Sequence, residues 1–314
     1  MNARFHDGLN HFKQPSIYLQ QHFKPYERAL VSSGFSAYPE LPTSDQSYDS
    51  VFLLLPKNII EAKYMIAYGL QLLNEGGAFV CAADNKAGGG RIKKLLQSFG
   101  FKKIHEDSRN KARVVWARKD NLNDQVISEA IKEGSQQAIL DSCFISQPGI
   151  FGWNKIDTGS KILTSYLPDD MGGIGADFGC GYGYLSDYLL SKNNNIEHLF
   201  CIDADHRTLD SCAQNLDKYA CKKTYLWYDL TDSNTDIKDM DFIVMNPPFH
   251  EGKTTDISVG VSFIKNAYSV LNKGGRLFIV ANRQLAYEDI LKSMFRKIDK
   301  HYEGEGFKVF EALK

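Results

Sequence analysis

The chain has 314 residues, of which 43% are hydrophobic and 24% charged, and its formal net charge is −1. This composition is typical of a folded globular protein, and the length suits two domains better than one. The absence of a basic surplus means that bulk charge does not indicate a nucleic-acid partner, so any such partner must be met by a local patch. No apolar run approaches the roughly 20 residues that cross a bilayer, and we expect no membrane partner.

The start of the chain has no apolar core of the kind that a signal peptide needs, so we expect a cytoplasmic protein. The cysteines form no C-x-x-C pair, which predicts scattered buried thiols and no metal site or disulfide frame. They are Cys81, Cys143, Cys180, Cys201, Cys212 and Cys221.

The first half begins with a mixed, proline-punctuated stretch over residues 1–48, which predicts short helices and loops. Strands and helices are then predicted in alternation: strand 51–55, helix 60–73, strand 78–83, helix 91–99 and strand 112–117. Such alternation predicts an α/β domain with a mostly parallel sheet and helices on its faces.

A polar segment follows, with a predicted helical stretch up to Gln137, and is the best candidate for a linker between two domains. We place the first domain at residues 1–120, the linker at 121–137 and the second domain at 138–314. The second domain again alternates: helix 160–167, strand 199–202, helix 207–218, strands 224–227 and 242–245, helix 262–271 and strand 276–280.

An internal repeat relates the two halves. Residues 73–80 (LNEGGAFV) match residues 271–278 (LNKGGRLF) in pattern, and seven positions separate Asp49 from Pro56 as they separate Asp241 from Pro248. Two copies of one α/β fold are therefore predicted. The copies differ where chemistry is expected, because Asn246 in the second copy corresponds to Leu54 in the first. We expect one active domain and one inactive relative.

The second copy contains a glycine-rich turn at residues 177–183 (DFGCGYG), between a predicted strand and a predicted helix. Glycines at alternate positions let the backbone approach a ligand closely, where the amides of a helix start are free to donate. Tyr184 stands where a G-x-G-x-x-G dinucleotide fingerprint needs glycine. The pattern D-x-G-x-G-x-G is closer to the first loop of S-adenosylmethionine-binding folds. The candidate cofactor residues here are Asp177, Gly179, Cys180, Gly181 and Gly183.

Two further acidic residues follow the next strands. Asp203 ends a predicted strand twenty positions after Gly183, which is the spacing at which a βαβ unit holds ribose hydroxyls. Asp229 follows the strand at 224–227 and is the candidate to meet the adenine amino group. A solvated loop aspartate is the alternative for both residues.

Residues 246–249 (NPPF) follow a strand and are expected at the carboxyl edge of the sheet, where ligands gather in open α/β folds. An exocyclic amine is a poor nucleophile, because its lone pair is delocalised. Acceptors on both N–H groups, namely the Asn246 side-chain oxygen and the Pro247 carbonyl, would favour a tetrahedral nitrogen and stabilise its developing charge. Pro248 adds rigidity, and Phe249 offers a ring on which a planar substrate can stack. Asn246 also borders the cofactor.

These motifs resemble those of the bacterial ribosomal RNA guanine-N2 methyltransferases, and most closely those that act on small-subunit rRNA. The resemblance is carried by residues 157–160 (DTGS), 177–183, 246–252 (NPPFHEG), 280–282 (VAN) and 307–309 (FKV), and in the first half by residues 56–58 (PKN) with 61–62 (EA). It implies two tandem Rossmann-like class I methyltransferase domains, of which the N-terminal copy lacks the cofactor motif and supports the RNA or its partner domain. It also implies S-adenosylmethionine as methyl donor and small-subunit rRNA as partner. The chain is short for that family and its start is hard to match.

Alternatives remain open at this point: action on large-subunit rRNA, on adenine N6 or on a protein glutamine, or a non-catalytic ribosome assembly factor. Retention of Asn246 and the glycine turn argues against the last of these. The cations that could contact RNA phosphates lie in the inactive copy, although a solvated surface explains them equally well. They are Arg91, Lys93, Lys94, Lys102, Lys103, Arg109, Lys111 and Arg113.

Overall fold

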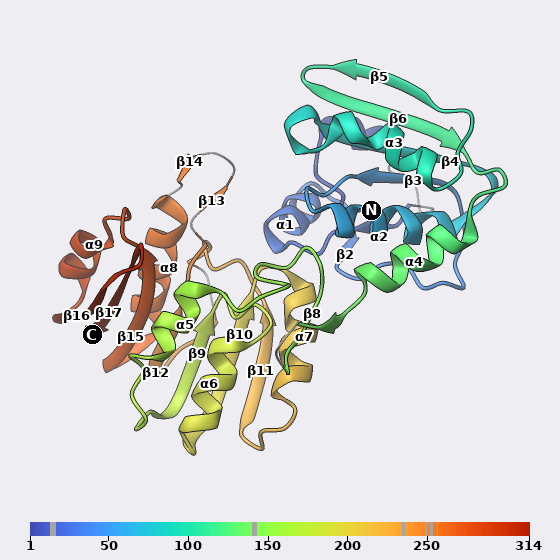
Figure 1. Cartoon of the computed structure of the whole chain (residues 1–314). Coiled ribbons are helices and arrows are strands. Elements are labelled where there is room, and N and C mark those ends of the chain that lie inside the picture. Colours follow the sequence, from blue (N-terminus) through green and yellow to red (C-terminus); the bar gives the residue numbers. More distant parts are fainter. Residues whose placement is uncertain (13–16, 140–142, 234–235, 249, 252–253, 256) are drawn as a thin grey trace. The chain divides into compact units, whose positions relative to one another are not determined.

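A computed structural model describes the chain except residues 13–16, 140–142, 234–235, 249, 252–253 and 256 (Figure 1). The chain divides into two compact units. The first comprises Met1–Gln137 with Gln147–Gly149, and the second comprises Ala138–Ser146 with Ile150–Lys314.

The first unit contains a four-stranded sheet in the order β3 (Tyr48–Leu54), β4 (Leu73–Asp84), β6 (Ala112–Arg118) and β5 (His105–Arg109). Strands β3 and β4 are parallel, and the other two pairs are antiparallel. Apolar residues of α2 (Ile59–Leu72), α3 (Ile92–Ser98) and α4 (Asp124–Gly134) form one core with alternate residues of the strands. These helices therefore pack on one face of this sheet.

The segments around the sheet are short. Before β3 the chain forms η1 (Asp7–Phe12), β1 (Leu19–Gln20), α1 (Lys24–Ser32) and β2 (Ala37–Tyr38), in agreement with the expected short helices and loops. Strands β1 and β2 pair in parallel as a separate two-stranded sheet. Two 3-10 turns, η2 (Asn85–Ala87) and η3 (Gly89–Arg91), connect β4 to α3.

The segment expected to be a linker is largely helical and belongs to the first unit. Helix α4 begins at an asparagine cap, where Asn123 Oδ1 accepts a hydrogen bond from the Val126 amide at 3.2 Å. Its residues Ile127 and Ala130 are 7% and 4% exposed and lie in the core of that unit. The prediction of a linker at 121–137 is therefore corrected. Most residues of this helix are polar and exposed, but its apolar residues lie on one side and are buried in the core.

The second unit contains a seven-stranded sheet in the order β11, β10, β9, β12, β15, β17, β16. Their bounds are β9 (Gly172–Phe178), β10 (Asn195–Asp203), β11 (Lys222–Trp227), β12 (Met240–Met245), β15 (Leu271–Asn282), β16 (Lys297–Gly304) and β17 (Phe307–Leu313). The strands from β11 to β15 are parallel, and β17 and β16 add an antiparallel edge. The mostly parallel sheet expected from the alternating pattern is thus confirmed for this unit, whereas two of the three strand pairs in the first unit are antiparallel.

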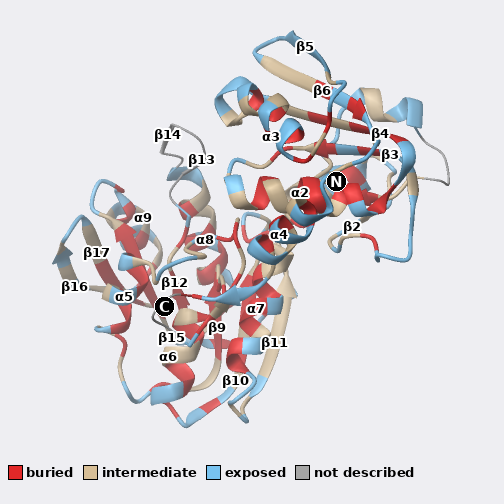
Figure 2. Ribbon diagram, turned by 45° about the vertical axis from the view of Figure 1, so that its right-hand side comes forward, coloured by how far each residue is buried: buried red, intermediate tan, exposed pale blue. Residues whose placement is uncertain are grey.

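Helices cover both faces of this larger sheet. Helices α5 (Thr158–Thr164), α6 (Tyr184–Lys192) and α7 (His206–Leu216) pack on one face, and α8 (Ile257–Val270) and α9 (Tyr287–Met294) pack on the other. The central strands are accordingly buried along nearly their whole length (Figure 2). Four two-residue strands complete the chain: β7 (Gln137–Ala138), β8 (Ile145–Ser146), β13 (His250–Glu251) and β14 (Thr254–Thr255).

The repeat holds at the level of single hydrogen bonds. Asn74 donates to Asp49 at 2.9 Å in the first unit, and Asn272 donates to Asp241 at 2.9 Å in the second. The terminal lysines of the two copies are equally matched: Lys119 Nζ donates to the carbonyls of Leu70 and Leu73, as Lys314 Nζ does to those of Tyr268 and Leu271.

The matched part comprises four strands, with β3, β4, β5 and β6 corresponding to β12, β15, β16 and β17. The sheet of the first unit ends at β3, whereas in the second unit β12 continues to β9, β10 and β11. The glycine turn follows β9, and Asp203 ends β10. The first unit therefore lacks the cofactor motif, and its described residues form no main-sheet strands that would carry it.

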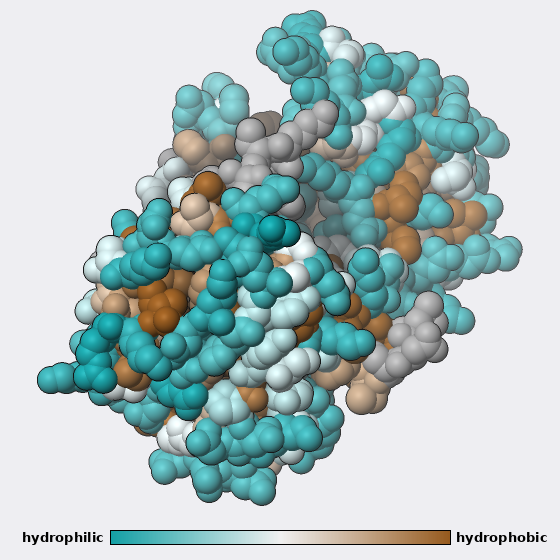
Figure 3. All heavy atoms as spheres, turned by 60° about the vertical axis from the view of Figure 1, so that its left-hand side comes forward, coloured by the Kyte–Doolittle hydropathy of each residue, from teal (hydrophilic) through white to brown (hydrophobic). Residues whose placement is uncertain are grey.

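The surface agrees with the ordinary composition of the chain. On the face shown in Figure 3 hydrophilic residues predominate, and hydrophobic ones gather in small patches. Within the described part of the chain, no helix has both the length and the apolar character that crossing a membrane requires.

Candidate active site

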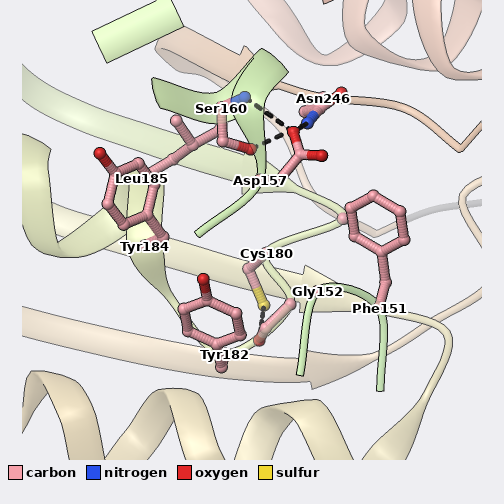
Figure 4. A pocket seen from close by; sticks show the side chains of 11 residues that line it. Phe151, Gly152, Asp157, Ser160, Cys180, Tyr182, Tyr184, Leu185 and Asn246 are labelled. Carbon is pink, nitrogen blue, oxygen red and sulfur yellow. Dashed lines mark hydrogen bonds between the residues drawn. The ribbon is translucent and has the colours of Figure 1, made fainter. Parts of the chain in front are cut away.

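A pocket lies at the carboxyl edge of the second unit's sheet, where the loops after β9 and β12 meet the segment before α5 (Figure 4). Strands β9 and β12 are neighbours, with Met245 paired to Phe178, so the residues that follow them lie side by side. The pocket is lined by Phe151, Gly152, Asp157, Ser160, Gly179, Cys180, Gly181, Tyr182, Tyr184, Leu185 and Asn246. The structure thus brings together the glycine turn and Asn246, which are far apart in the sequence.

The glycine turn depends on left-handed backbone conformations. Gly181 and Gly183 have φ values of +54° and +93°, which residues with a side chain rarely adopt. A Cβ at Gly183 would lie 2.8 Å from the Cys212 sulfur, whereas a Cβ at Gly181 would meet no atom within 4 Å. Gly183 therefore lets the turn pack against α7, and Gly181 leaves open space beside the pocket.

Asp203 supports this turn from β10. Its Oδ2 accepts a hydrogen bond from the Gly181 amide at 2.9 Å, and its Oδ1 accepts one from the Asp205 amide at 2.9 Å. Burial raises the pKa of Asp203 to about 6, although the amide donors act in the opposite direction. Asp203 does not line the pocket itself and is joined to it through Gly181.

Asp177 lies beneath the turn, in the interior of the unit. Its Oδ2 accepts a hydrogen bond from the Ser186 hydroxyl at 2.7 Å, while its Oδ1 is buried without a hydrogen-bond partner among the described residues. Burial, reinforced by the nearby Asp203 carboxylate, raises the pKa of Asp177 to about 7. The geometry gives Asp177 a place under the loop and not on the pocket wall.

Asp229 is likewise away from the pocket lining. It is 4% exposed, and its Oδ1 accepts hydrogen bonds from the Thr231 amide at 3.0 Å and the Thr231 hydroxyl at 2.6 Å. Of the two prolines that follow Asn246, Pro247 is buried and Pro248 is exposed. Phe249, the expected stacking ring, lies outside the described residues.

The side-chain amide of Asn246 is held by two residues from the start of α5. Its Nδ2 donates to Asp157 Oδ2 at 2.7 Å and to Ser160 Oγ at 2.8 Å, and the side chains of Asn246 and Asp157 point toward one another (Figure 4). Asp157 is also the N-cap of α5 and accepts the Ser160 amide at 2.9 Å. The Asn246 Oδ1 is buried and accepts no hydrogen bond from any described residue.

Three residues that line the pocket were not predicted from the sequence as functional residues. Asp157 and Ser160 belong to the DTGS segment that contributed to the resemblance, and the D-x-x-S spacing is a helix-cap signal, yet nothing in it indicates a contact with Asn246. Phe151 lines the pocket while 67% exposed. An exposed phenylalanine at a pocket rim offers a flat apolar face to a ligand.

Both halves of the chain match known protein families. The family described as "Methyltransferase small domain" matches residues 141–311, and "Methyltransferase small domain N-terminal" matches residues 4–132. Ribosomal RNA small subunit methyltransferase C of Acinetobacter baylyi is 32% identical over 273 residues, covering 85% of this chain and 80% of the relative. The protein of that name from Shewanella pealeana is 28% identical over 297 residues, covering 93% and 84%.

A solved structure matches nearly the whole chain. It is the 16S rRNA N2-guanine methyltransferase RsmC of T. thermophilus, in complex with AdoMet and guanosine. The TM-score is 0.77 at 26% identity, and the match covers 94% of this chain and 81% of that one.

Proposed function

The chain belongs to the methyltransferase small domain family, and from this premise we propose that it methylates the exocyclic N2 of a guanine in small-subunit rRNA. S-adenosylmethionine is the methyl donor. The relatives that carry the name of an rRNA small-subunit methyltransferase and the RsmC structure with AdoMet and guanosine support this proposal. The observation that carries it is the Oδ1 of Asn246, which is buried beside the glycine turn and accepts no hydrogen bond from the residues that the structure describes.

The residues of the pocket suit the cofactor. Open space beside Gly181 leaves room for a ligand against the backbone, and the Asp203 carboxylate at the end of β10, which is hydrogen-bonded to the Gly181 amide, can accept hydroxyl donors. When bound, S-adenosylmethionine supplies an electrophilic methyl group on a sulfonium. We assign Asp177, Gly179, Cys180, Gly181, Gly183, Asp203 and Asp229 to cofactor binding, with Asp177 and Asp229 acting through the shape of the loops that hold them.

Asn246 would act on the guanine amine. An acceptor at Oδ1 draws one amine N–H into a hydrogen bond, and the Pro247 carbonyl takes the other, so that the nitrogen lone pair is freed from the purine ring and aimed at the methyl group. The same two oxygens would stabilise the positive charge on the nitrogen until one N–H proton is lost to water, which leaves the methylated amine and S-adenosylhomocysteine. Phe151 provides an exposed ring at the pocket rim for a planar group, in addition to the role that we propose for Phe249.

The test compares wild type with Asn246→Ala on small-subunit rRNA, with nucleoside digestion and mass spectrometry as the readout. Methyl transfer should fall by about 100-fold or more while S-adenosylmethionine binding by calorimetry is retained, because the lost group acts mainly in the transition state. Near-normal turnover in the variant would overturn the assignment of the site. Product identity decides the substrate: N6-methyladenosine, or methylation confined to large-subunit rRNA, contradicts the proposal.

A further inference from the structure

The four-stranded sheet of the first unit has an open face. Alternate strand residues, among them Val51, Phe79 and Val115, are buried against α2, α3 and α4. The intervening residues point to the opposite side and are not part of the core that these three helices form; on that side the 3-10 helix η1 contacts Phe52 through Phe12. The burial of β6 alternates accordingly, with Val115 and Ala117 buried and Trp116 and Arg118 exposed.

Aromatic residues form a row across this open face. The strand registers place Phe52 beside Val80, Val80 beside Trp116, and Trp116 beside His105. Phe52 is 54% exposed and Trp116 is 39% exposed. The His105 and Trp116 rings stack at 5.6 Å with an angle of 18° between their planes, and the Phe12 ring lies 6.0 Å from that of Phe52. Large apolar side chains so placed usually meet a partner.

The repeat explains why this face is free. By the alignment of the two copies, Phe52 corresponds to Val244 and Val80 to Phe278. In the second unit these two residues are buried in the core that α5 closes with Leu163. The described first unit has no counterpart of α5. At two solvent-facing positions of this face the side chains are aromatic, namely Phe52 and Trp116.

The charge of the chain is divided between its two parts. Residues 1–137 contain 18 Lys and Arg against 14 Asp and Glu, whereas residues 138–314 contain 19 against 24. The excess is concentrated in residues 84–118, with ten Lys and Arg against three Asp and Glu. The chain therefore contains a basic segment although its total charge is near zero. This segment includes the two strands that carry Trp116 and His105.

Some Lys and Arg side chains of this segment form ion pairs with acidic residues, and others do not. Lys93 and Arg113 pair with Glu106, and Arg109 pairs with Asp107. Lys94, Lys102 and Lys103 are exposed and form no ion pair with any residue that the structure describes. Lys102 and Lys103 directly precede the strand that begins with His105, at the end of the aromatic row.

We propose that the open face of the β3-β4-β6-β5 sheet binds unpaired bases of RNA. Phe52 and Trp116 stack on the bases, and the lysines flanking the row contact the phosphates. Aromatic side chains exposed on one face of a four-stranded sheet suit single-stranded RNA, because stacking tolerates any base while cations follow the backbone. The excess of positive charge favours RNA over a protein partner. The inference rests on the proposed function only in taking RNA as the substrate.

The test measures binding by fluorescence anisotropy of a labelled, mixed-sequence single-stranded RNA of about 12 nucleotides. The full-length variants are Phe52→Ala, Trp116→Ala and Trp116→Phe. We expect affinity about tenfold weaker for each alanine variant and close to wild type for Trp116→Phe, since phenylalanine still stacks. The matched control is Tyr38→Ala, which removes an aromatic residue of the same unit that is 45% exposed and lies on another strand. It should leave the affinity unchanged.

Equal affinity for all variants would overturn the inference. So would equal loss in Tyr38→Ala, or a change in oligomeric state by sedimentation with RNA affinity preserved, since the face would then contact protein. The readout is independent of methyl transfer: in Trp116→Ala, kcat should be retained and KM for RNA should rise. If Asn246→Ala keeps full turnover while Trp116→Ala weakens RNA binding, the active-site assignment alone fails.

Discussion

The side-chain amide of Asn246 could adopt two orientations related by a half-turn, and only one of them would present its oxygen to the guanine amine that we propose as the substrate. Its Nδ2 has two hydrogens, and Asp157 Oδ2 at 2.7 Å and Ser160 Oγ at 2.8 Å accept both. A flipped amide would place oxygen against the Asp157 carboxylate, which cannot donate when ionised. Asp157 and Ser160 are thus positioning residues that fix the acceptor at Oδ1.

Replacement of Asp157 tests this orientation. In Asp157→Ala we expect kcat to fall by about 10- to 100-fold through misplacement of Asn246, with a helix-cap loss of about 1 kcal/mol in stability. Asp157→Asn is the matched control, because its amide oxygen can accept both hydrogen bonds and asparagine is an equally good cap. Steady-state kinetics and urea unfolding provide the measurements. If Asp157→Asn is as slow as Asp157→Ala, the negative charge of this side chain matters and not its positioning of Asn246.

The buried carboxyl of Asp177 makes stability depend on pH. Its pKa is raised from 3.8 to about 7 in the folded protein, so the folded state binds the proton more tightly than the unfolded state. The free energy of unfolding should therefore decrease as pH rises from about 4 to about 7, with Asp203 contributing in the same direction up to about 6.

The variant Asp177→Asn removes one titrating group. Urea unfolding between about pH 5 and 8 should show a shallower decrease in stability than in wild type. The comparison is with Asp187→Asn, on the same unit, whose carboxylate is bound to Lys218 at 2.8 Å. An unchanged slope in Asp177→Asn would mean that this carboxyl is not the source of the pH dependence.

At the scale of elements, two helices determine which residues of the neighbouring strands are buried. Asp157, the N-cap residue of helix α5, lines the pocket, and Leu163 of the same helix packs in one core of the second unit. Helix α4 has no chemical role in the site, but it completes the core of the first unit through Ile127 and Ala130. Whether a sheet face is buried or open therefore follows from which helices each copy has kept.

The placement of α4 gives a stability prediction. Ile127→Ala should lower the free energy of unfolding by about 2–4 kcal/mol, because a buried side chain is lost from a packed core. Gln125→Ala, on the exposed surface of the same helix, should change it by less than about 0.5 kcal/mol. Equal, small effects of both changes in urea unfolding would instead support a loosely attached linker.

At the scale of the whole molecule, the uneven distribution of charge indicates which part of the chain is suited to bind RNA. The part with excess positive charge is the one that we propose to hold the polyanion, while the other part contains the pocket and has more acidic than basic residues. Such a division lets cofactor and RNA be bound by different surfaces. It also removes the objection that a net charge of −1 raised against an RNA partner.

Charge reversal separates the two parts. Changing Lys94, Lys102 and Lys103 together to glutamate should weaken RNA binding and reduce its dependence on salt concentration, while cofactor affinity stays unchanged. The matched control reverses Lys192, Lys273 and Lys292, three exposed lysines of the second unit, with the same change in net charge. Filter binding over a salt series distinguishes them. Equal losses in both triple variants would show that only total charge matters.

Much of this molecule could be predicted from its sequence, because local patterns encode local structure. Alternating apolar runs predict the strands and helices, the glycine turn predicts the loop between β9 and α6, and the repeat predicts two related copies. The position of Asn246 directly after a strand places it at the ligand-binding edge of the sheet. In each case the physical constraint acts between residues near in sequence, or through the general rule that parallel strands end at one edge.

Only the tertiary structure decides which distant groups meet. The hydrogen bond from Asn246 to Asp157 spans 89 residues, and no local pattern of either segment indicates it. Burial likewise differs between segments that look alike in the sequence. Asp177 lies under the glycine loop, whereas Asp203 accepts a hydrogen bond from it. The polar helix α4 packs into the core of the first unit. The open face with Phe52 and Trp116 is also a tertiary result, since exposure depends on which neighbouring elements are present and not on the strand itself.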